Sequence, residues 1–251
     1  MKICIILPAF NEAPVIGKVL DDLKKEIKKP ARQPAFAEHL LAGNALHSNA
    51  GGEKINAQIV VIDDGSSDKT GEIVQNKRTK VLRHVLNRGL GGALGTGLVY
   101  AKRKSFDIAV TLDSDGQHDP KDIKKVIKPI IDKKADVVIG TRWKSNKSQI
   151  PWDRKIITIC SNILTFFLFG IPTTDSQSGF RAFSKKALEK ITIKTQGMEV
   201  SSELFGEIER NKLRLVEVPI RVIYTSYSRR KGQSNLNSIQ ILLKLILRIF
   251  R

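Results

Sequence analysis

Two carboxylates stand two positions apart directly after an apolar run in the middle of the chain. The stretch that follows Ile108-Ala109-Val110-Thr111-Leu112 is Asp113-Ser114-Asp115-Gly116-Gln117-His118. The end of a strand is where an open α/β sheet binds its ligands. Two aspartates placed there can converge on one hard cation that bridges the phosphates of a nucleotide. The same residue types are common at ordinary turns, so the interpretation depends on groups elsewhere in the chain.

Short apolar runs of the length of a strand alternate along the chain with segments whose apolar residues have helical spacing. This alternation predicts a mostly parallel sheet with helices on both faces. We expect strands at Ile3 to Pro8, Ile59 to Ile62, Val81 to Val85, Ile108 to Leu112 and Val137 to Ile139. We expect helices over Asn11 to Lys29, from an N-cap at Ser67 or Asp68 towards Asn76, from the Gly-rich turn to about Lys104, and from near Pro120. Residues 30–57 have weak periodicity and predict a surface insertion.

Composition indicates a globular protein with an anionic partner. The chain has 251 residues, of which 41% are hydrophobic, so it can bury a full core. Its net charge of +18 favours nucleic acid, a phosphorylated substrate or an anionic membrane as partner. The two cysteines support neither a disulfide framework nor a zinc cluster, and no secretory signal is visible. We therefore expect the protein on the cytoplasmic side.

Two further loops carry groups that could hold a nucleotide. Asp63 and Asp64 end the second expected strand, where a carboxylate can accept hydrogen bonds from a base or ribose, although a helix-capping turn would look the same. The turn that begins Asn87-Arg88-Gly89 is rich in glycine and lets backbone approach a ligand. It lacks the Lys-Ser/Thr ending of a P-loop and does not follow the first strand. A kinase, an ATPase and a dehydrogenase are therefore disfavoured.

Four motifs in this order resemble the family 2 glycosyltransferases of the GT-A fold, and most of all the dolichol-phosphate and polyprenyl-phosphate sugar synthases. They are Leu7-Pro8-Ala9-Phe10-Asn11-Glu12, Val61-Ile62-Asp63-Asp64-Gly65-Ser66-Ser67-Asp68, Asn87-x-Gly89-x-Gly91-x-Ala93 and Asp113-x-Asp115-Gly116-Gln117-His118. The resemblance covers nearly the whole chain apart from roughly residues 30 to 57. Four ordered motifs are far more specific than any one of them.

The resemblance implies a nucleotide-sugar site and a divalent cation, Mg²⁺ or Mn²⁺. The residues it assigns to the nucleotide sugar are Pro8, Ala9, Glu12, Asp63, Asp64, Gly89, Asp113, Ser114, Asp115, Arg229 and Lys231, with Asp63 more structural than the rest. Asp113, Asp115 and Gln117 are the expected metal and catalytic groups. His118 either touches the donor or is a surface turn residue. Arg229 to Lys231 resemble a loop that closes over the diphosphate, although Asn235 departs from the family pattern.

The resemblance places an acceptor phosphate on the other side of the site. Arg142 and Arg154 are expected to hold it, with Thr158 as a hydroxyl donor, and an arginine fork suits a phosphate. The alternative is that both arginines lie on the surface. Residues 178–183 are expected to wall the sugar pocket, and Glu203 lies where relatives have an acid near the acceptor.

Two apolar segments are candidates for a membrane interface. Ile156 to Pro172 falls short of a spanning helix, and Leu236 to Arg251 has one polar stripe bordered by Lys and Arg. They can lie in the lipid interface, or pack in the core or against a partner subunit. We expect a catalytic domain over residues 1–225 and a basic loop with an interface helix over 226–251. The protein would be peripheral, on the cytoplasmic face of the cell or ER membrane.

The expected function is inverting transfer of a sugar from a nucleotide sugar, UDP-sugar favoured over GDP-mannose, to polyprenyl or dolichyl phosphate. A lipid phosphate is already ionised near neutral pH and needs no general base. The alternative is transfer to a glycan hydroxyl, which needs a carboxylate base such as Glu203. A nucleic-acid-binding module is disfavoured because no nucleic-acid motif appears and aromatics are only 6% of the chain. The oligomeric state stays open.

Overall fold

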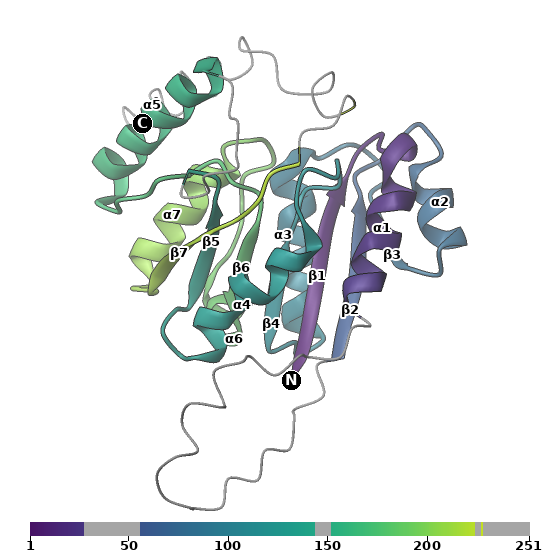
Figure 1. Ribbon diagram of the computed structural model, residues 1–251, viewed down its shortest axis with the longest axis horizontal. Helices are drawn as coiled ribbons and strands as arrows, with labels where there is room; N and C mark the ends of the chain where they lie inside the picture. Colours follow the sequence, from purple (N-terminus) through teal and green to yellow (C-terminus); the bar gives the residue numbers. More distant parts are fainter. Residues whose placement is uncertain (28–55, 144–151, 224–226, 228–251) are drawn as a thin grey trace, which may run out of the picture.

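The protein is built on one seven-stranded sheet. The computed structural model describes residues 1–27, 56–143, 152–223 and 227. The strand order is β3-β2-β1-β4-β6-β5-β7 (Figure 1). The strands are β1 (Lys2–Ala9), β2 (Asn56–Asp63), β3 (Lys80–Arg83), β4 (Ile108–Thr111), β5 (Val137–Thr141), β6 (Arg181–Ser184) and β7 (Leu215–Pro219). Only β6 runs antiparallel to its neighbours, so the expected mostly parallel sheet is confirmed.

Helices cover both faces of the sheet, as the alternating pattern predicts. One core lies against α1 (Ala13–Ile27), α2 (Thr70–Asn76) and α4 (Ile123–Ile131). The other lies against α3 (Gly89–Arg103), α6 (Lys185–Lys190) and α7 (Val200–Arg210). Successive β1 side chains enter opposite cores: Ile5 and Leu7 enter the first, and Cys4 and Ile6 enter the second. Both faces of the central strands are therefore buried.

The loops that leave β1 and β2 are joined to each other at the carboxyl edge of the sheet. Asn11 adopts a left-handed backbone conformation with φ of 54°, which asparagine tolerates better than most residues. Its backbone N–H donates to Ser66 Oγ at 3.0 Å, and its side-chain Oδ1 accepts from the Ser67 backbone N–H at 2.9 Å. The two loops are thus held as one unit beside the ends of the parallel strands.

Several boundaries differ from the prediction: β2 begins at Asn56, within the expected insertion, β5 ends at Thr141 and α1 begins at Ala13. Two further differences have a visible cause. The third strand ends at Arg83, because His84 turns inward while Val85 is 97% exposed. The N-cap of α2 is Lys69, which makes no side-chain cap, so the prediction of Ser67 or Asp68 was wrong. Asp68 instead accepts hydrogen bonds from the backbone N–H groups of Thr70 and Ala13, which ties the β2 loop to the start of α1.

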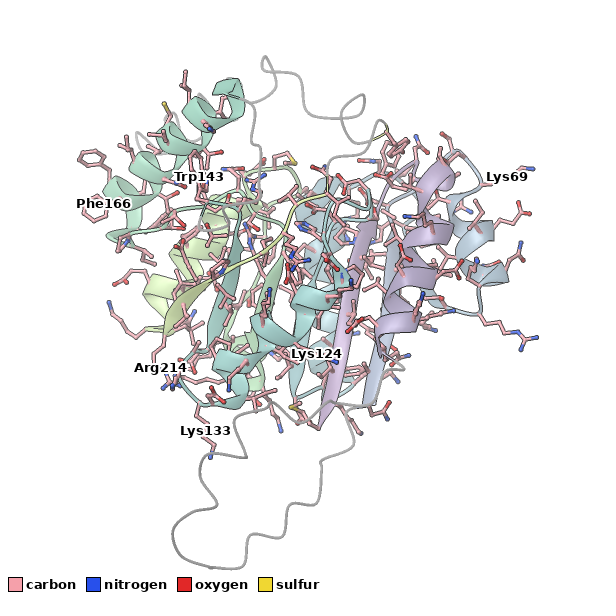
Figure 2. The ribbon with its side chains drawn as sticks, viewed as in Figure 1. Lys69, Lys124, Lys133, Trp143, Phe166 and Arg214 are labelled. Carbon is pink, nitrogen blue, oxygen red and sulfur yellow. The ribbon has the colours of Figure 1, made fainter. Side chains whose placement is uncertain are left out.

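Helix α5 (Trp152–Phe169) has an apolar face turned outward and small hydroxyl side chains turned inward. It stands at one end of the molecule and contacts α7 (Figure 1). The exposed apolar side chains are Ile156, Ile159, Ile163, Phe166 and Phe167, and Figure 2 shows Phe166 on the outer side. Thr158, Ser161 and Thr165 are buried. Within the described ranges, no helix combines the length and apolar character required to cross a membrane.

A buried carboxylate joins three elements at the amino edge of β5. Asp136, which is 3% exposed, accepts hydrogen bonds from the backbone N–H and the guanidinium of Arg214 and from Lys186 Nζ. Figure 2 places Arg214 at the lower end of the molecule, far from α5. Burial alone raises the pKa of Asp136, but these hydrogen bonds and charges outweigh it and hold the pKa well below its usual value. The carboxylate therefore stabilises the fold in its ionised form.

Replacing Asp136→Asn should lower the free energy of unfolding by about 2 kcal/mol at neutral pH, since hydrogen bonds to a buried charged group are lost. The folded-state pKa is depressed, so the wild-type advantage is present above the unfolded value of about 3.9 and disappears as the pH falls. Denaturant titrations at several pH values measure this difference. Asp132→Asn is the matched control, because Asp132 is 31% exposed and pairs only with Lys128 one turn away. An equal loss of unfolding free energy in both variants would contradict the conclusion that ionised Asp136 stabilises the fold.

Candidate functional site

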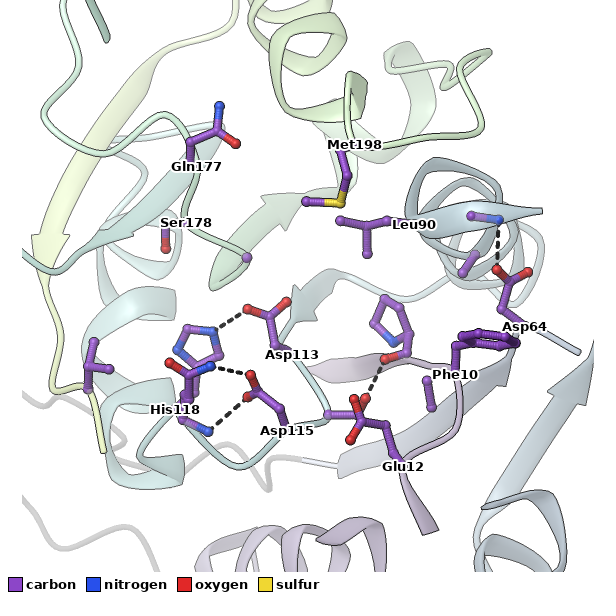
Figure 3. A pocket seen from close by; sticks show the side chains of 18 of the residues that line it. Phe10, Glu12, Asp64, Leu90, Asp113, Asp115, His118, Gln177, Ser178 and Met198 are labelled. Atoms are coloured by element: carbon purple, nitrogen blue, oxygen red, sulfur yellow. Dashed lines mark hydrogen bonds and ion pairs between the residues drawn. The ribbon is translucent and has the colours of Figure 1, made fainter. Parts of the chain in front are cut away.

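A cavity of about 500 Å³ opens at the carboxyl edge of the sheet. Figure 3 shows Asp113, Asp115 and Glu12 along one side of it, with Leu90 and Met198 across from them. The expected site residues that line it are Pro8, Ala9, Glu12, Asp64, Gly89, Asp113, Ser114, Asp115, Gln117, Arg142 and Thr158. Side chains that follow the ends of β1, β2, β4 and β5, together with one from α5, therefore meet in one place. The strand-end argument predicts this for the strands.

The Asp113 carboxylate is surrounded by positive groups and packs against a glycine. His118 Nε2 lies 3.0 Å from Asp113 Oδ2, and an ionised carboxylate can only accept, so the ring nitrogen donates. Burial raises the pKa of Asp113, but the hydrogen bond from His118 and the charges of His118, Arg142 and Arg181 lower it below its usual value. A Cβ added to Gly179 would lie 2.6 Å from Asp113 Cγ. Asp113 is therefore held in its ionised form, and its carboxylate has room only because Gly179 has no Cβ.

His118 is 9% exposed and packs edge-on against Phe180 at 5.2 Å between ring centroids. The interpretation of His118 as a surface turn residue was therefore wrong. It lines the cavity between Asp113, to which it hydrogen-bonds, and Phe180, which is distant in sequence.

Asp115 and Gln117 offer oxygen ligands for a cation beside Asp113. Asp115 Oδ1 accepts from the Gln117 backbone N–H at 3.0 Å, and the Gln117 side-chain amide lies against Oδ2. The pKa of Asp115 is raised by burial and by the negative charge of Asp113. A hard divalent cation would relieve this like-charge repulsion, so the residues fit Mg²⁺ or Mn²⁺. Among the described residues no group of three or more His, Cys, Asp or Glu could hold a metal, so substrate oxygens would have to complete its shell.

Asp64 anchors the Gly-rich turn at the opposite end of the cavity. Its carboxylate accepts from the backbone N–H groups of Arg88 at 2.9 Å and Gly89 at 2.7 Å, and contacts His84 Nδ1 at 2.6 Å. His84 Nε2 in turn lies 2.9 Å from Thr96 Oγ1 on α3. One carboxylate thus fixes the turn that borders the cavity.

The β1 loop contributes two groups whose hydrogen bonds also fix the wall. Ser114 Oγ donates to the Pro8 carbonyl oxygen at 2.7 Å, which joins the Asp113 loop to the β1 loop. Glu12 is 7% exposed, and Tyr227 Oη donates to its Oε2 at 2.8 Å. The Tyr227 side chain therefore lies beside Glu12, which lines the cavity.

The glycines at the start of α3 serve packing within the protein. The Gly91 and Gly92 backbone N–H groups donate to the Gln196 carbonyl oxygen, at 2.7 and 3.2 Å. A Cβ on Gly91 would lie 2.9 Å from the Thr195 carbonyl carbon, closer than real Cβ atoms come. The loop before α7 therefore occupies this helix end, so the expectation that these glycines admit a ligand's close approach does not describe Gly91.

Glu203 supports that same loop. Its two carboxylate oxygens accept from the backbone N–H groups of Lys194 and Thr195, both at 2.9 Å, and from the Thr195 hydroxyl. Glu203 is not among the residues that line the cavity. Its hydrogen bonds fix the backbone of residues 194–195, in the loop that packs against the Gly-rich turn at Gly89.

Arg142 lies at the acceptor end of the cavity and pairs with a fully buried carboxylate. Arg142 Nε lies 2.7 Å from Asp175 Oδ2, and a terminal nitrogen lies 2.6 Å from Oδ1. Thr158, on the inner face of α5, lines the same region and is 5% exposed. Arg142 and Thr158 therefore both line the cavity, while Arg154 falls in the first turn of α5, where side chains lie outside the described part of the chain.

The remaining predictions divide in two. Asp63 lies outside the cavity: its Oδ1 accepts from the Ser66 backbone N–H at 3.0 Å and its Oδ2 lies 3.4 Å from Arg83 Nε. Arg229, Lys231 and Leu236 to Arg251 lie outside the described residues.

Sequence reasoning missed several residues of the cavity wall that no local motif marks, among them Ile157, Ser161, Gln177, Met198 and Val222. The family resemblance identified Thr158 on α5, but not Ile157 or Ser161 beside it.

Replacing Glu203→Gln should lower the free energy of unfolding by about 1–2 kcal/mol, because a neutral amide cannot accept all three hydrogen bonds. The Gly91 and Gly92 amides should exchange hydrogen faster, since the loop that accepts from them loosens. Hydrogen exchange and denaturant titration measure both effects. Glu209→Gln, on the same helix and 46% exposed, is the control. Unchanged exchange at both glycines would refute this role for Glu203.

Comparisons with known proteins agree with this geometry. Residues 4–192 match the model of "Glycosyl transferase family 2". An uncharacterized protein of Methanocaldococcus jannaschii is 41% identical over 98% of this chain and 91% of its own length. The UDP-N-acetylglucosamine–dolichyl-phosphate N-acetylglucosaminyltransferase of Methanococcus voltae is 34% identical over 98% of this chain and 95% of its own.

A solved structure, glucosyl-3-phosphoglycerate synthase from Mycobacterium tuberculosis with Mn²⁺, UDP and glucosyl-3-phosphoglycerate, superposes with a TM-score of 0.60. It is 18% identical, and the match covers 97% of this chain and 79% of that one, which supports the fold alone. The matched family model covers most of the chain, including every strand from β1 to β6. The chain is therefore a glycosyltransferase of family 2.

Proposed function

We propose that this enzyme transfers a sugar from a UDP-sugar to polyprenyl or dolichyl phosphate, with inversion at the anomeric carbon. The observation that carries the proposal is that one cavity is lined both by the carboxylates of Asp113 and Asp115 and by Arg142 and Thr158. Asp113 and Asp115 face the place for a cation and diphosphate, and Arg142 with Thr158 face the place for an acceptor phosphate. The Methanococcus voltae relative is named for this pair of substrates, which favours N-acetylglucosamine as the sugar.

The donor end of the cavity suits a nucleoside diphosphate. Asp64 borders its far end, where the base and ribose would lie, and Glu12 stands between Asp64 and Asp115 (Figure 3). Pro8 and Ala9 also line the cavity. A bound Mg²⁺ or Mn²⁺ would neutralise charge on the leaving diphosphate. Asp113, Asp115 and Gln117 would hold it. Asp113 stays ionised through its positive neighbours, so it can serve the cation or a ribose hydroxyl without exchanging a proton.

The acceptor end requires no general base. A phosphate monoester is ionised near neutral pH, so its oxygen can attack the anomeric carbon directly. The task of Arg142 and Thr158 is to orient that oxygen opposite the leaving diphosphate. The charge of Arg142 also contributes to the lowered pKa of Asp113, so the residue assigned to the acceptor and the residue assigned to the donor act on each other electrostatically.

The alternative acceptor, a glycan hydroxyl, would need a carboxylate base. Glu203 was the candidate, but both of its oxygens accept hydrogen bonds from residues 194–195 and it does not line the cavity. A hydroxyl acceptor therefore lacks its proposed base, which favours the phosphate acceptor.

The outer face of α5 suits a lipid surface beside this acceptor end. Phe167 is 78% exposed and Ile163 is 51% exposed, while Thr158 on the inner face lines the cavity. Burying such side chains in the acyl boundary is favourable by about 25 cal/mol per Å² of apolar area. With a net charge of +18, the protein would also be attracted to anionic lipid. We propose peripheral attachment to the cytoplasmic face of the membrane.

Incubation with radiolabelled nucleotide sugars and either polyprenyl phosphate or oligosaccharide acceptors tests the proposal. We expect a lipid-linked product from a UDP-sugar in the presence of Mg²⁺ or Mn²⁺, with the opposite anomeric configuration to the donor. Labelling of oligosaccharide with no lipid-linked product under any donor would overturn it.

Replacing Asp115→Asn should reduce metal-dependent turnover by about 100-fold or more, because a cation ligand and one negative charge are lost. The fold should persist, because the substitution removes a negative charge beside Asp113. It therefore relieves the repulsion that helps to raise the pKa of Asp115. Turnover over a range of Mn²⁺ concentrations, together with thermal unfolding, separates the two effects. Asp132→Asn serves again as the surface control, and near-normal turnover of the Asp115 variant would refute the metal assignment.

Replacing Gly179→Ala should lower turnover about tenfold or more while leaving the fold intact, because the new Cβ displaces the Asp113 carboxylate. The Cβ would lie 2.6 Å from Asp113 Cγ and Oδ2, and a carboxylate can rotate away where backbone cannot. Gly95→Ala is the matched control, since its Cβ would meet only ordinary contacts of 3.5 Å or more. Steady-state turnover and thermal unfolding of both variants measure the effect. Equal turnover in the two variants would show that Asp113 tolerates displacement.

A further inference from the structure

We propose that Asp175 is a positioning residue that fixes Arg142 for the acceptor phosphate, and that α5 is tied to the same unit. This inference rests on the proposed function, since it concerns how that acceptor site is held. Asp175 itself does not line the cavity, whereas Arg142 does. Its effect on an acceptor must therefore pass through Arg142.

The Arg142–Asp175 pair fixes both the backbone and the side chain of Arg142. Asp175 Oδ2 accepts from the Arg142 backbone N–H at 3.0 Å and from Nε at 2.7 Å, and Oδ1 accepts from a terminal nitrogen at 2.6 Å. The Asp175 side chain is 0% exposed and that of Arg142 is 21% exposed. A bidentate fork of this kind sets the plane of the guanidinium as well as its place.

Asp175 is in turn held by its neighbours in the loop that precedes β6. Glu217 on β7 accepts from the Thr174 backbone N–H at 2.6 Å and from the hydroxyls of Thr173 and Thr174, both at 2.7 Å. Thr173 Oγ1 lies 3.3 Å from the Asp175 backbone nitrogen. A half-buried carboxylate on a strand therefore anchors the segment that presents Asp175.

The same loop is bonded to α5 through one asparagine. Asn162 Nδ2 donates to the Thr174 carbonyl oxygen at 2.8 Å, and Asn162 Oδ1 accepts from the Ser176 backbone N–H at 2.9 Å. These bonds flank Asp175 on both sides. Because α5 also carries Thr158, the two expected phosphate contacts, Arg142 and Thr158, take their positions from one loop.

This arrangement reduces the cost of binding a phosphate. An arginine side chain loses rotamer freedom when it is ordered, and the Asp175 pair orders it before the acceptor arrives. Preorganisation of this kind raises affinity without adding a contact to the ligand. Loss of Asp175 should therefore weaken acceptor binding and leave donor binding unchanged.

Binding of a water-soluble prenyl phosphate, citronellyl phosphate, and of UDP with Mn²⁺ to the full chain tests the inference by calorimetry. Asp175→Asn should raise the Kd for citronellyl phosphate about 10-fold or more, the effect expected when hydrogen bonds to a charged group are lost, while the Kd for UDP changes less than about twofold. Asn162→Ala should raise the citronellyl phosphate Kd by a smaller factor. It serves as the second variant if Asp175→Asn fails to fold.

A double-mutant cycle separates positioning from general structure. If Asp175 acts through Arg142, then Arg142→Ala combined with Asp175→Asn binds citronellyl phosphate no more weakly than Arg142→Ala alone. Additive losses, parallel losses of UDP and citronellyl phosphate affinity, or unchanged binding in Asp175→Asn would each overturn the inference while the proposed function stands. A wild-type protein that binds UDP but not citronellyl phosphate would overturn both together.

Discussion

Keeping two carboxylates side by side in one cavity is the constraint on which the rest of this site depends. Asp113 is compensated by His118, Arg142 and Arg181, which lower its pKa, whereas Asp115 is left with a raised pKa beside a like charge. The protein thus satisfies one carboxylate and leaves the other in need of a cation. That imbalance supports a metal that arrives with a diphosphate over one held permanently by protein ligands.

The same positive groups connect the two ends of the cavity. Arg181 is buried between the charges of Asp113 and Asp175, and burial lowers its pKa to about 10 although both carboxylates raise it. It donates to the Ser176 carbonyl oxygen at 3.0 Å and to Ser201 Oγ at 3.1 Å. The donor carboxylate and the partner of the acceptor arginine therefore share one buried cation, and β6, the antiparallel strand, supplies it.

Sequence patterns predicted the sheet and the groups at its strand ends because those features are local. Apolar runs define β1, β2, β4 and β5, and the Asp113 to Gln117 spacing identifies carboxylates on one turn. The Gly91 interpretation differs from the structure because its partners, Gln196 and Gly197, are distant in sequence from the Gly-rich turn. Glu203 was assigned by resemblance, and the hydrogen bonds that it accepts from Lys194 and Thr195 follow no motif. Asp175 had no signal at all, since its role depends on a tertiary contact with Arg142.

The most direct measurement is a crystal structure of the protein with UDP, Mn²⁺ and a short prenyl phosphate, with anomalous scattering used to locate the manganese. The account predicts manganese beside Asp115 and the diphosphate, and the prenyl phosphate within hydrogen-bonding distance of Arg142 while the Asp175 pair stays intact. Manganese remote from Asp115, or a prenyl phosphate bound away from Arg142 with the cavity otherwise unchanged, would contradict it.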